Sequence, residues 1–196
     1  MALQTLVKIS DVTNLSDARY CAGMGVEWLG FSMDRLSLEK FREIRGWLAG
    51  VSIVGETASA DISAIREFVG QYQPDVLEIT HPGLLPEVKT LGLPVILRID
   101  LADGLPASPD GADYYLIDHS DPFAHLDGPT LDYLDPFAFR YPTLIGFGVN
   151  VANVREILKQ IPFKGLSLTG GEETRPGYKD FGEMADILEL LEEEEF

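Results

Sequence analysis

The stretch Val7-Lys8-Ile9-Ser10-Asp11-Val12-Thr13 has the pattern of a short apolar strand that ends in polar and acidic residues just before a helix start. A strand followed at once by a helix is the repeating unit of parallel α/β folds, and in a closed barrel the carboxyl ends of the strands face the active site. The side chains of Ser10 and Asp11 are therefore predicted to bear on function.

The overall composition predicts one domain, residues 1–196, because a chain of 196 residues with 45% hydrophobic content suffices for one core and is short for two. Fifteen basic and 32 acidic residues give a formal charge of −17, which repels nucleic acid and anionic membranes. A small anionic ligand remains compatible with this charge, since backbone N–H groups at a helix N-terminus can hold a phosphate locally.

The single cysteine, Cys21, excludes an intrachain disulfide and is expected to be a buried small hydrophobe in a helix. No N-terminal run has the charged-then-apolar order of a secretory signal, and no apolar run reaches transmembrane length. We therefore expect a soluble cytoplasmic protein with no membrane association.

Eight apolar runs with β character recur along the chain, and polar residues gather at their C-terminal ends. They are Leu6–Ser10, Trp28–Met33, Ser52–Thr57, Val76–His81, Pro94–Asp100, Tyr114–Asp118, Thr143–Phe147 and Gly165–Thr169. Helical patterns lie between them at Leu15–Met24, Leu38–Leu48, Ile62–Tyr72, Leu84–Leu91, Thr130–Phe139, Val151–Ile161 and Phe181–Glu195. Leu101–Asp113 is rich in glycine and proline and is predicted to be a loop.

This order predicts an α/β protein with a single-domain (β/α)₈ TIM barrel whose fifth helix is shortened or missing. An open doubly wound sheet uses the same alternation, so periodicity alone leaves both architectures open. The count of eight strands favours the closed barrel.

Two segments resemble the phosphoribosylanthranilate isomerase family. Lys8-Ile9-Ser10-Asp11-Val12-Thr13 is similar to its K-I-C-G-[IL]-T opening, and Glu173-Thr174-Arg175-Pro176-Gly177-Tyr178-Lys179-Asp180 matches its E-x-x-P-G-x-K-D segment. The resemblance spans nearly the whole chain. It implies a (β/α)₈ barrel of the aldose–ketose isomerase class that performs the Amadori rearrangement of a phosphoribosyl amine to a 1-deoxyketose phosphate in tryptophan biosynthesis, without a cofactor.

The rearrangement needs an acid that protonates the ribose ring oxygen and a base that removes the C2 proton. The resemblance implies a sixth-strand aspartate as the acid, which corresponds to Asp118, and a first-strand cysteine as the base, where this chain has Ser10. A serine hydroxyl is too weakly acidic to replace a thiolate without a strong activating partner. Asp11, which replaces a glycine of the family, is a candidate base, although strand alternation brings it to the pocket only if the strand has ended or bulged. The candidate catalytic residues are Asp11, Ser10 and Asp118.

Phosphate binding is predicted at Gly148, Thr169, Gly170 and Gly171, which follow the last two strands. The alternative for these glycines is that they only permit tight strand-to-helix turns. Departures from the family are Phe147, where the family has a glycine, and Thr169-Gly170, which replaces a serine pair.

The resemblance also implies three substrate-binding positions: Arg35, Glu78 and Ser167. Arg35 matches an arginine near the substrate carboxylate, and its alternative is a surface arginine that opens the next helix. Glu78 replaces a glutamine and adds negative charge where an anionic substrate must fit. Ser167 replaces an aspartate that helps to recognise the anthranilate end.

No metal is expected, because no compact ligand motif such as H-x-x-x-H occurs, and His81 and His119 are interpreted as loop histidines. Two functions stay open. The first is the isomerase, a monomer or homodimer that acts on a small phosphorylated sugar-amine ligand. The second is a non-catalytic or re-purposed paralogue that binds a phosphorylated metabolite or a protein partner, which the substitutions at the site favour.

Overall fold

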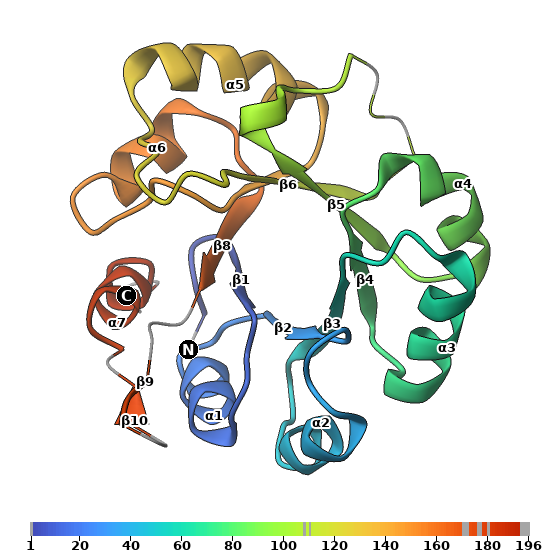
Figure 1. Ribbon diagram of the computed structural model, residues 1–196. Coiled ribbons are helices and arrows are strands. Elements are labelled where there is room, and N and C mark those ends of the chain that lie inside the picture. Colours follow the sequence, from blue (N-terminus) through green and yellow to red (C-terminus); the bar gives the residue numbers. More distant parts are fainter. Residues whose placement is uncertain are drawn as a thin grey trace.

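Eight parallel strands close into one barrel in the computed structural model, which describes residues 2–107, 109, 111–169, 173–175, 178–179 and 181–192 (Figure 1). The strands are β1 (Leu6–Ser10), β2 (Trp28–Ser32), β3 (Ser52–Thr57), β4 (Val76–Ile79), β5 (Val95–Asp100), β6 (Tyr114–Asp118), β7 (Thr143–Ile145) and β8 (Gly165–Thr169). Strand β8 closes the ring on β1, with Leu6 opposite Gly165 and Ser10 opposite Thr169. The predicted TIM barrel is thereby confirmed, and the open sheet is excluded.

The helices lie outside the barrel (Figure 1). They are α1 (Leu15–Gly23), α2 (Leu38–Arg45), α3 (Ile62–Tyr72), α4 (Leu85–Val88), α5 (Gly128–Arg140), α6 (Val154–Gln160) and α7 (Gly182–Leu190). The 3₁₀ turns η1 (Pro82–Leu84) and η2 (Lys89–Leu91) flank α4, and only the 3₁₀ turn η3 (Leu101–Asp103) occurs between β5 and β6 in the described part of the chain. The prediction of a shortened or missing fifth helix is therefore confirmed. None of the described helices is long and apolar enough to cross a membrane.

Four helices begin at polar residues that cap their free N–H groups. The side chains of Asn14, Ser37, Asp61 and Asp127 accept hydrogen bonds from the first turns of α1, α2, α3 and α5. Such caps satisfy donors that lack a partner within the helix. They fix where the chain turns from each strand into the following helix.

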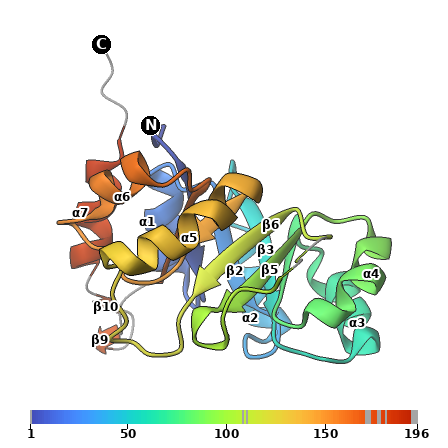
Figure 2. The same ribbon diagram turned by 90° about the horizontal axis from the view of Figure 1, so that it is seen from above.

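Some element ends differ from the sequence-based expectation. Strand β7 ends at Ile145 rather than Phe147, because the backbone turns at Gly148 with a φ of +66°. A hairpin of β9 (Glu173–Arg175) and β10 (Tyr178–Lys179) was not predicted. Figure 2 shows this hairpin on the side of the barrel opposite the N-terminus, which is the side of the strands' carboxyl ends.

The barrel interior has an apolar layer and a polar layer. Inward-facing residues of six strands form the apolar cluster: Trp28, Val54, Val76, Ile96, Leu116 and Leu144. Because side chains alternate along a strand, the residues two positions further on also face inward. On β3 and β4 these residues are the buried carboxylates Glu56 and Glu78. The fold thus places charged side chains inside the barrel, next to the apolar layer.

Candidate active site

Five charged side chains form alternating ion pairs across the polar layer, in the order Glu56, Lys8, Glu78, Arg98, Asp118; we call this set the ionic chain. Lys8 Nζ contacts Glu56 Oε1 and lies 2.9 Å from Glu78 Oε2. Arg98 Nη1 lies 3.8 Å from Glu78 Oε1, and Arg98 Nη2 contacts Asp118 Oδ2. Strands β1, β3, β4, β5 and β6 each supply one member. The two cations and three carboxylates connect one side of the barrel mouth to the other.

Space for this arrangement comes from Gly30 on β2. A Cβ atom at that position would lie 2.0 Å from Glu56 Oε1 and 3.1 Å from Lys8 Nζ. Glycine is the residue that lets a neighbouring group approach the backbone this closely. Gly30 therefore makes room for the Lys8–Glu56 pair.

Gly30→Ala is expected to lower the free energy of unfolding by about 1–3 kcal/mol, because the added methyl group displaces a buried, paired carboxylate. Denaturant unfolding monitored by circular dichroism measures the change. Gly23→Ala in α1 is the control, since a Cβ there meets nothing within 4 Å. Equal stability of the two variants would contradict the close approach at Gly30.

Burial and ion pairing shift the pKa values of the ionic chain in opposite directions. Burial lowers the pKa of Lys8, but Glu78 and Glu56 outweigh it, and the pKa lies above its ordinary value of 10.5. Burial raises the pKa of Glu78, and Lys8 opposes the rise. Burial likewise lowers the pKa of Arg98, and Asp118 and Glu78 reverse the shift. Lys8 and Arg98 therefore stay cationic at neutral pH, as buried charges do when they are paired.

Ser10 lies in the barrel beside Lys8 and Ser167. Its Oγ accepts a hydrogen bond from Lys8 Nζ at 2.6 Å and shares another with Ser167 Oγ at 2.9 Å. Both serines are buried. A serine acts as a nucleophile or a general base only when a strong base accepts its proton. Neither hydrogen-bond partner of Ser10 can do so, because Lys8 is a cation and Ser167 carries a hydroxyl group.

Asp11 lies just past the end of β1 with a φ of +54°, so strand alternation no longer sets the direction of its side chain. This left-handed conformation costs a residue other than glycine about 1–2 kcal/mol. The carboxylate accepts a hydrogen bond from Arg35 Nη2 at 2.9 Å, and Arg35 Nε also donates to Ser32 Oγ at 3.2 Å. Asp11 thus holds Arg35 at the rim of the mouth, and its own N–H lies 3.2 Å from Glu56 Oε2.

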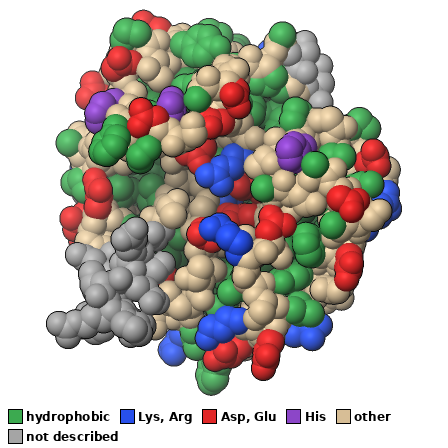
Figure 3. Space-filling model, viewed as in Figure 1, with side chains coloured by type: hydrophobic (Ala, Val, Ile, Leu, Met, Phe, Trp, Pro, Cys, Tyr) green, Lys and Arg blue, Asp and Glu red, His purple; other side chains and the backbone are tan. Residues whose placement is uncertain are grey.

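Two cavities lie over the ends of the ionic chain. Glu56 and Glu78 line one of about 300 Å³ together with Arg35 and Arg98. Asp118 lines the other, of about 340 Å³, and Thr80 and Arg98 belong to both. Figure 3 shows basic and acidic side chains gathered in the hollow at the centre of this face. The two cavities therefore adjoin at the mouth of the barrel.

The two loop histidines beside this mouth bond to backbone. His81 Nε2 lies 3.1 Å from the Ala58 carbonyl oxygen, and His119 Nδ1 accepts from the Asp121 N–H at 3.0 Å. Asp118 Oδ1 accepts from the N–H of His119 at 2.9 Å, which orients the carboxylate at the end of β6. These contacts fit the interpretation of both histidines as loop residues.

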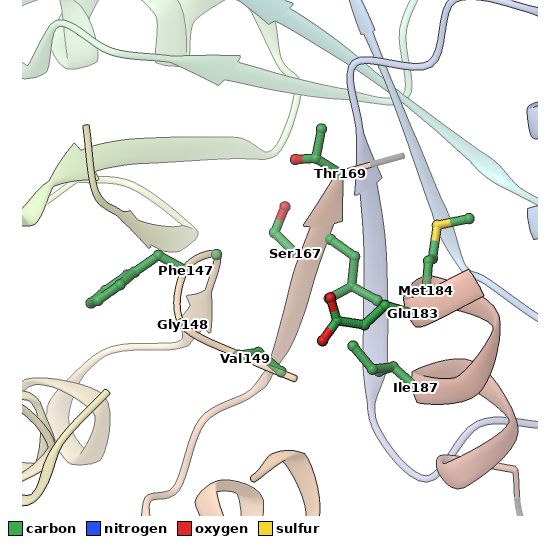
Figure 4. A pocket seen from close by; sticks show the side chains of 10 residues that line it. Phe147, Gly148, Val149, Ser167, Thr169, Glu183, Met184 and Ile187 are labelled. Carbon is green, nitrogen blue, oxygen red and sulfur yellow. The ribbon is translucent and has the colours of Figure 1, made fainter. Parts of the chain in front are cut away.

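Three predicted binding residues, Gly148, Ser167 and Thr169, line a third cavity of about 270 Å³ between β7, β8 and α7 (Figure 4). Gly170 and Gly171 lie outside the described residues. A Cβ at Gly148 would lie 2.9 Å from the backbone nitrogen of Leu126, so the turn itself requires glycine. Figure 4 shows the carboxylate of Glu183, in the first turn of α7, directed into this cavity.

The sequence-predicted residues thus fall into two groups. Ser10, Asp11, Arg35, Glu78 and Asp118 lie at the central mouth, and the predicted phosphate residues that the structure describes lie beside α7. Sequence reasoning missed Lys8, Glu56 and Arg98 as members of the site. The sequence signal that could have found them is a charged residue at an inward-facing position of an otherwise apolar strand. Burying such a charge costs free energy unless an opposite charge pairs with it.

Known proteins similar to this chain were found by sequence and by structure, although no family model matches it. The N-(5'-phosphoribosyl)anthranilate isomerase of Rhodopseudomonas palustris is 30% identical over 211 residues, covering 95% of this chain and 97% of the relative. That of Nitrobacter winogradskyi is 26% identical over 209 residues, covering 95% and 92%.

Solved structures support the fold. Phosphoribosyl anthranilate isomerase from Thermus thermophilus superposes with a TM-score of 0.77 at 24% identity, covering 94% of this chain and 96% of that one. Another, solved with reduced 1-(o-carboxyphenylamino)-1-deoxyribulose 5-phosphate, has a TM-score of 0.75 at 22% identity, covering 94% and 97%. With a curated relative at 30% identity over nearly the full length of both proteins, the chain belongs to the N-(5'-phosphoribosyl)anthranilate isomerase family.

Proposed function

We propose that this protein catalyses the Amadori rearrangement of N-(5'-phosphoribosyl)anthranilate in tryptophan biosynthesis. The observation that carries the proposal is the ionic chain, which presents a carboxylate at each end to adjoining cavities in a barrel of this family. Acid–base chemistry on a sugar requires two such groups in different roles.

Asp118 acts as the general acid in this proposal. Its carboxyl proton passes to the ribose ring oxygen, the bond from C1 to that oxygen breaks, and the nitrogen lone pair forms a C1=N iminium ion. A carboxylate on the other side of the mouth then takes the C2 proton. The C2–H electron pair becomes a C1=C2 double bond, the iminium electrons return to nitrogen, and the resulting enolamine tautomerises to the ketone.

Substrate binding is divided between the two regions of the site. Arg35 and Arg98 are cations at the mouth, suited to the anthranilate carboxylate. The cavity lined by Gly148 and Thr169 is proposed to hold the phosphate. This separation matches a substrate with an anionic group at each end.

The proposal is tested by fluorescence assays of the purified protein with N-(5'-phosphoribosyl)anthranilate made in situ from anthranilate and ribose 5-phosphate. Turnover, together with growth of a bacterial strain that lacks its own isomerase, is the expected result. Binding of the reduced product analogue without turnover would favour the non-catalytic alternative instead.

Glu183→Gln is expected to tighten binding of ribose 5-phosphate about two- to fivefold, because it removes a negative charge at the N-terminus of α7, where an anion is favoured. Isothermal titration calorimetry at low ionic strength measures the change in Kd. Glu189→Gln, near the C-terminal end of the same helix, is the control. If both variants tightened binding equally, the cause would be the net charge of the protein rather than the position of Glu183.

A further inference from the structure

The identity of the base follows from the two ends of the ionic chain. Glu78, in its middle, approaches both cations, and only 3% of its side chain is exposed. Glu56 and Asp118 are the ends: each pairs with one cation and lines a cavity at the mouth. Glu78 also lines the cavity beside Glu56, but it pairs with both cations, and 3% of its side chain is exposed against 10% for Glu56. The two ends are therefore the carboxylates more open to proton exchange with a bound molecule.

The charge of the ionic chain favours one bound proton. With three ionised carboxylates against Lys8 and Arg98 its net charge is −1, and a single proton makes it neutral. Burial penalises uncompensated charge, and it raises the pKa of Glu78 against the opposing influence of Lys8. Moving the proton from the Asp118 end to the Glu56 end during turnover leaves the net charge unchanged.

Glu56 is also fixed where a base is needed. Its Oε1 and the Oγ of Ser10 both contact Lys8 Nζ, so the carboxylate lies next to the end of β1. Its Oε2 accepts a hydrogen bond from the N–H of Asp11. The carboxylate of Asp11, in contrast, is engaged by Arg35 at the rim.

We propose that Glu56 is the general base that removes the C2 proton; this assignment rests on the proposed function. The C2–H bond breaks, its electron pair forms the C1=C2 bond of the enolamine, and the proton is held on the Glu56 carboxylate. Lys8 stays paired with Glu78 when Glu56 is neutralised, so no cation is left alone in the barrel. Asp11 is a positioning residue that holds Arg35.

Steady-state kinetics of Glu56→Gln, Glu78→Gln and Asp11→Asn test the assignment. Glu56→Gln is expected to lower kcat at least about 100-fold with little change in KM and to abolish the acidic limb of the pH profile of kcat/KM. Glu78→Gln makes the same chemical change against the same lysine and is expected to keep both limbs of the pH profile, which separates the loss of an ion pair from the loss of the base. Asp11→Asn is expected to raise KM, since an uncharged amide holds Arg35 less firmly than the carboxylate does, and to leave kcat within about fivefold.

Three controls separate catalysis from folding. Glu56→Asp keeps a carboxylate and is expected to retain the acidic limb with more activity than the glutamine variant. Binding of the reduced product analogue and thermal unfolding report whether each variant is intact. Substrate carrying deuterium at C2 is expected to slow turnover of the aspartate variant.

The outcomes are distinct. Activity of Glu56→Gln within threefold of an active parent protein would overturn the base assignment alone. A 100-fold loss in Asp11→Asn with an active Glu56→Gln would transfer the role to Asp11. A parent protein that binds the analogue but does not turn over substrate would overturn the proposed function and the assignment together.

Discussion

Asp118→Asn is expected to lower kcat about 100- to 10,000-fold, because an amide cannot give a proton to the ribose ring oxygen. The amide is close in size to the carboxylate and still accepts a hydrogen bond from Arg98, so KM is expected to change less than kcat. Fluorescence assays with N-(5'-phosphoribosyl)anthranilate measure both constants. Loss of the basic limb of the kcat/KM profile would identify Asp118 as the acid specifically.

The control is Asp100→Asn on the neighbouring strand. Asp100 lies opposite Asp118 in the β5–β6 register, and it accepts hydrogen bonds from the N–H groups of Ala102 and Ser120. Since these are turn contacts, this variant is expected to lose less than about tenfold in kcat. Comparable losses in both variants would argue that Asp118 acts through the loop structure rather than by proton transfer.

Lys8→Met is expected to cost about 3–5 kcal/mol of folding free energy at pH 7, because it leaves buried carboxylates without their shared cation. Lys8 is fully buried, and it contacts both Glu56 and Glu78. Denaturant unfolding at constant pH measures the loss. In the triple variant Lys8→Met/Glu56→Gln/Glu78→Gln no uncompensated charge remains at these positions, so most of the stability should return.

The pH dependence of the Lys8→Met deficit follows from Glu78. Its pKa is raised above 4.5 by burial, against the influence of Lys8, so the folded protein holds this proton more tightly than the unfolded chain. Stability that depends on Glu78 is therefore complete below about 4.5 and falls as pH rises through its folded pKa. Loss of Lys8 raises that pKa further, so the deficit should grow from pH 4.5 to pH 7. If the loss of folding free energy in Lys8→Met were constant over this range, it would not depend on the ionisation of Glu78, and this explanation would be wrong.

Most of the fold could be predicted from local pattern. The bounds of β1, β3, β6, β8 and α3 agree with the sequence-based expectation. Continuous apolar runs and polar caps act over a few residues, and these short-range signals remain valid in the folded chain. The predicted end of β7 and the predicted bounds of α6 were wrong. Gly148, which has a left-handed φ, and the turn that follows it lie between these two elements.

The candidate site could be predicted only in part. The end of β1 stood out because Ser10 replaces the cysteine of the family, and Asp118 stood out because it ends β6. The direction of the Asp11 side chain was beyond the sequence, since it depends on a φ of +54° and on Arg35, 24 residues away. The role of Lys8 was equally hidden, because a lysine in a strand is normally solvated.

The sequence by itself therefore determined the order of strands and helices and the resemblance to the family, and it favoured the closed barrel over an open sheet. It also showed a serine, Ser10, at the end of β1, where the resemblance to the family implies a cysteine base. Only the tertiary structure decided which charges meet: Lys8 and Glu56 are 48 residues apart, and barrel closure and strand register bring them into contact. Ion pairing depends on distance in space, which local pattern does not encode. The proposed base thus lies on β3 rather than on β1, where the resemblance to the family implies it.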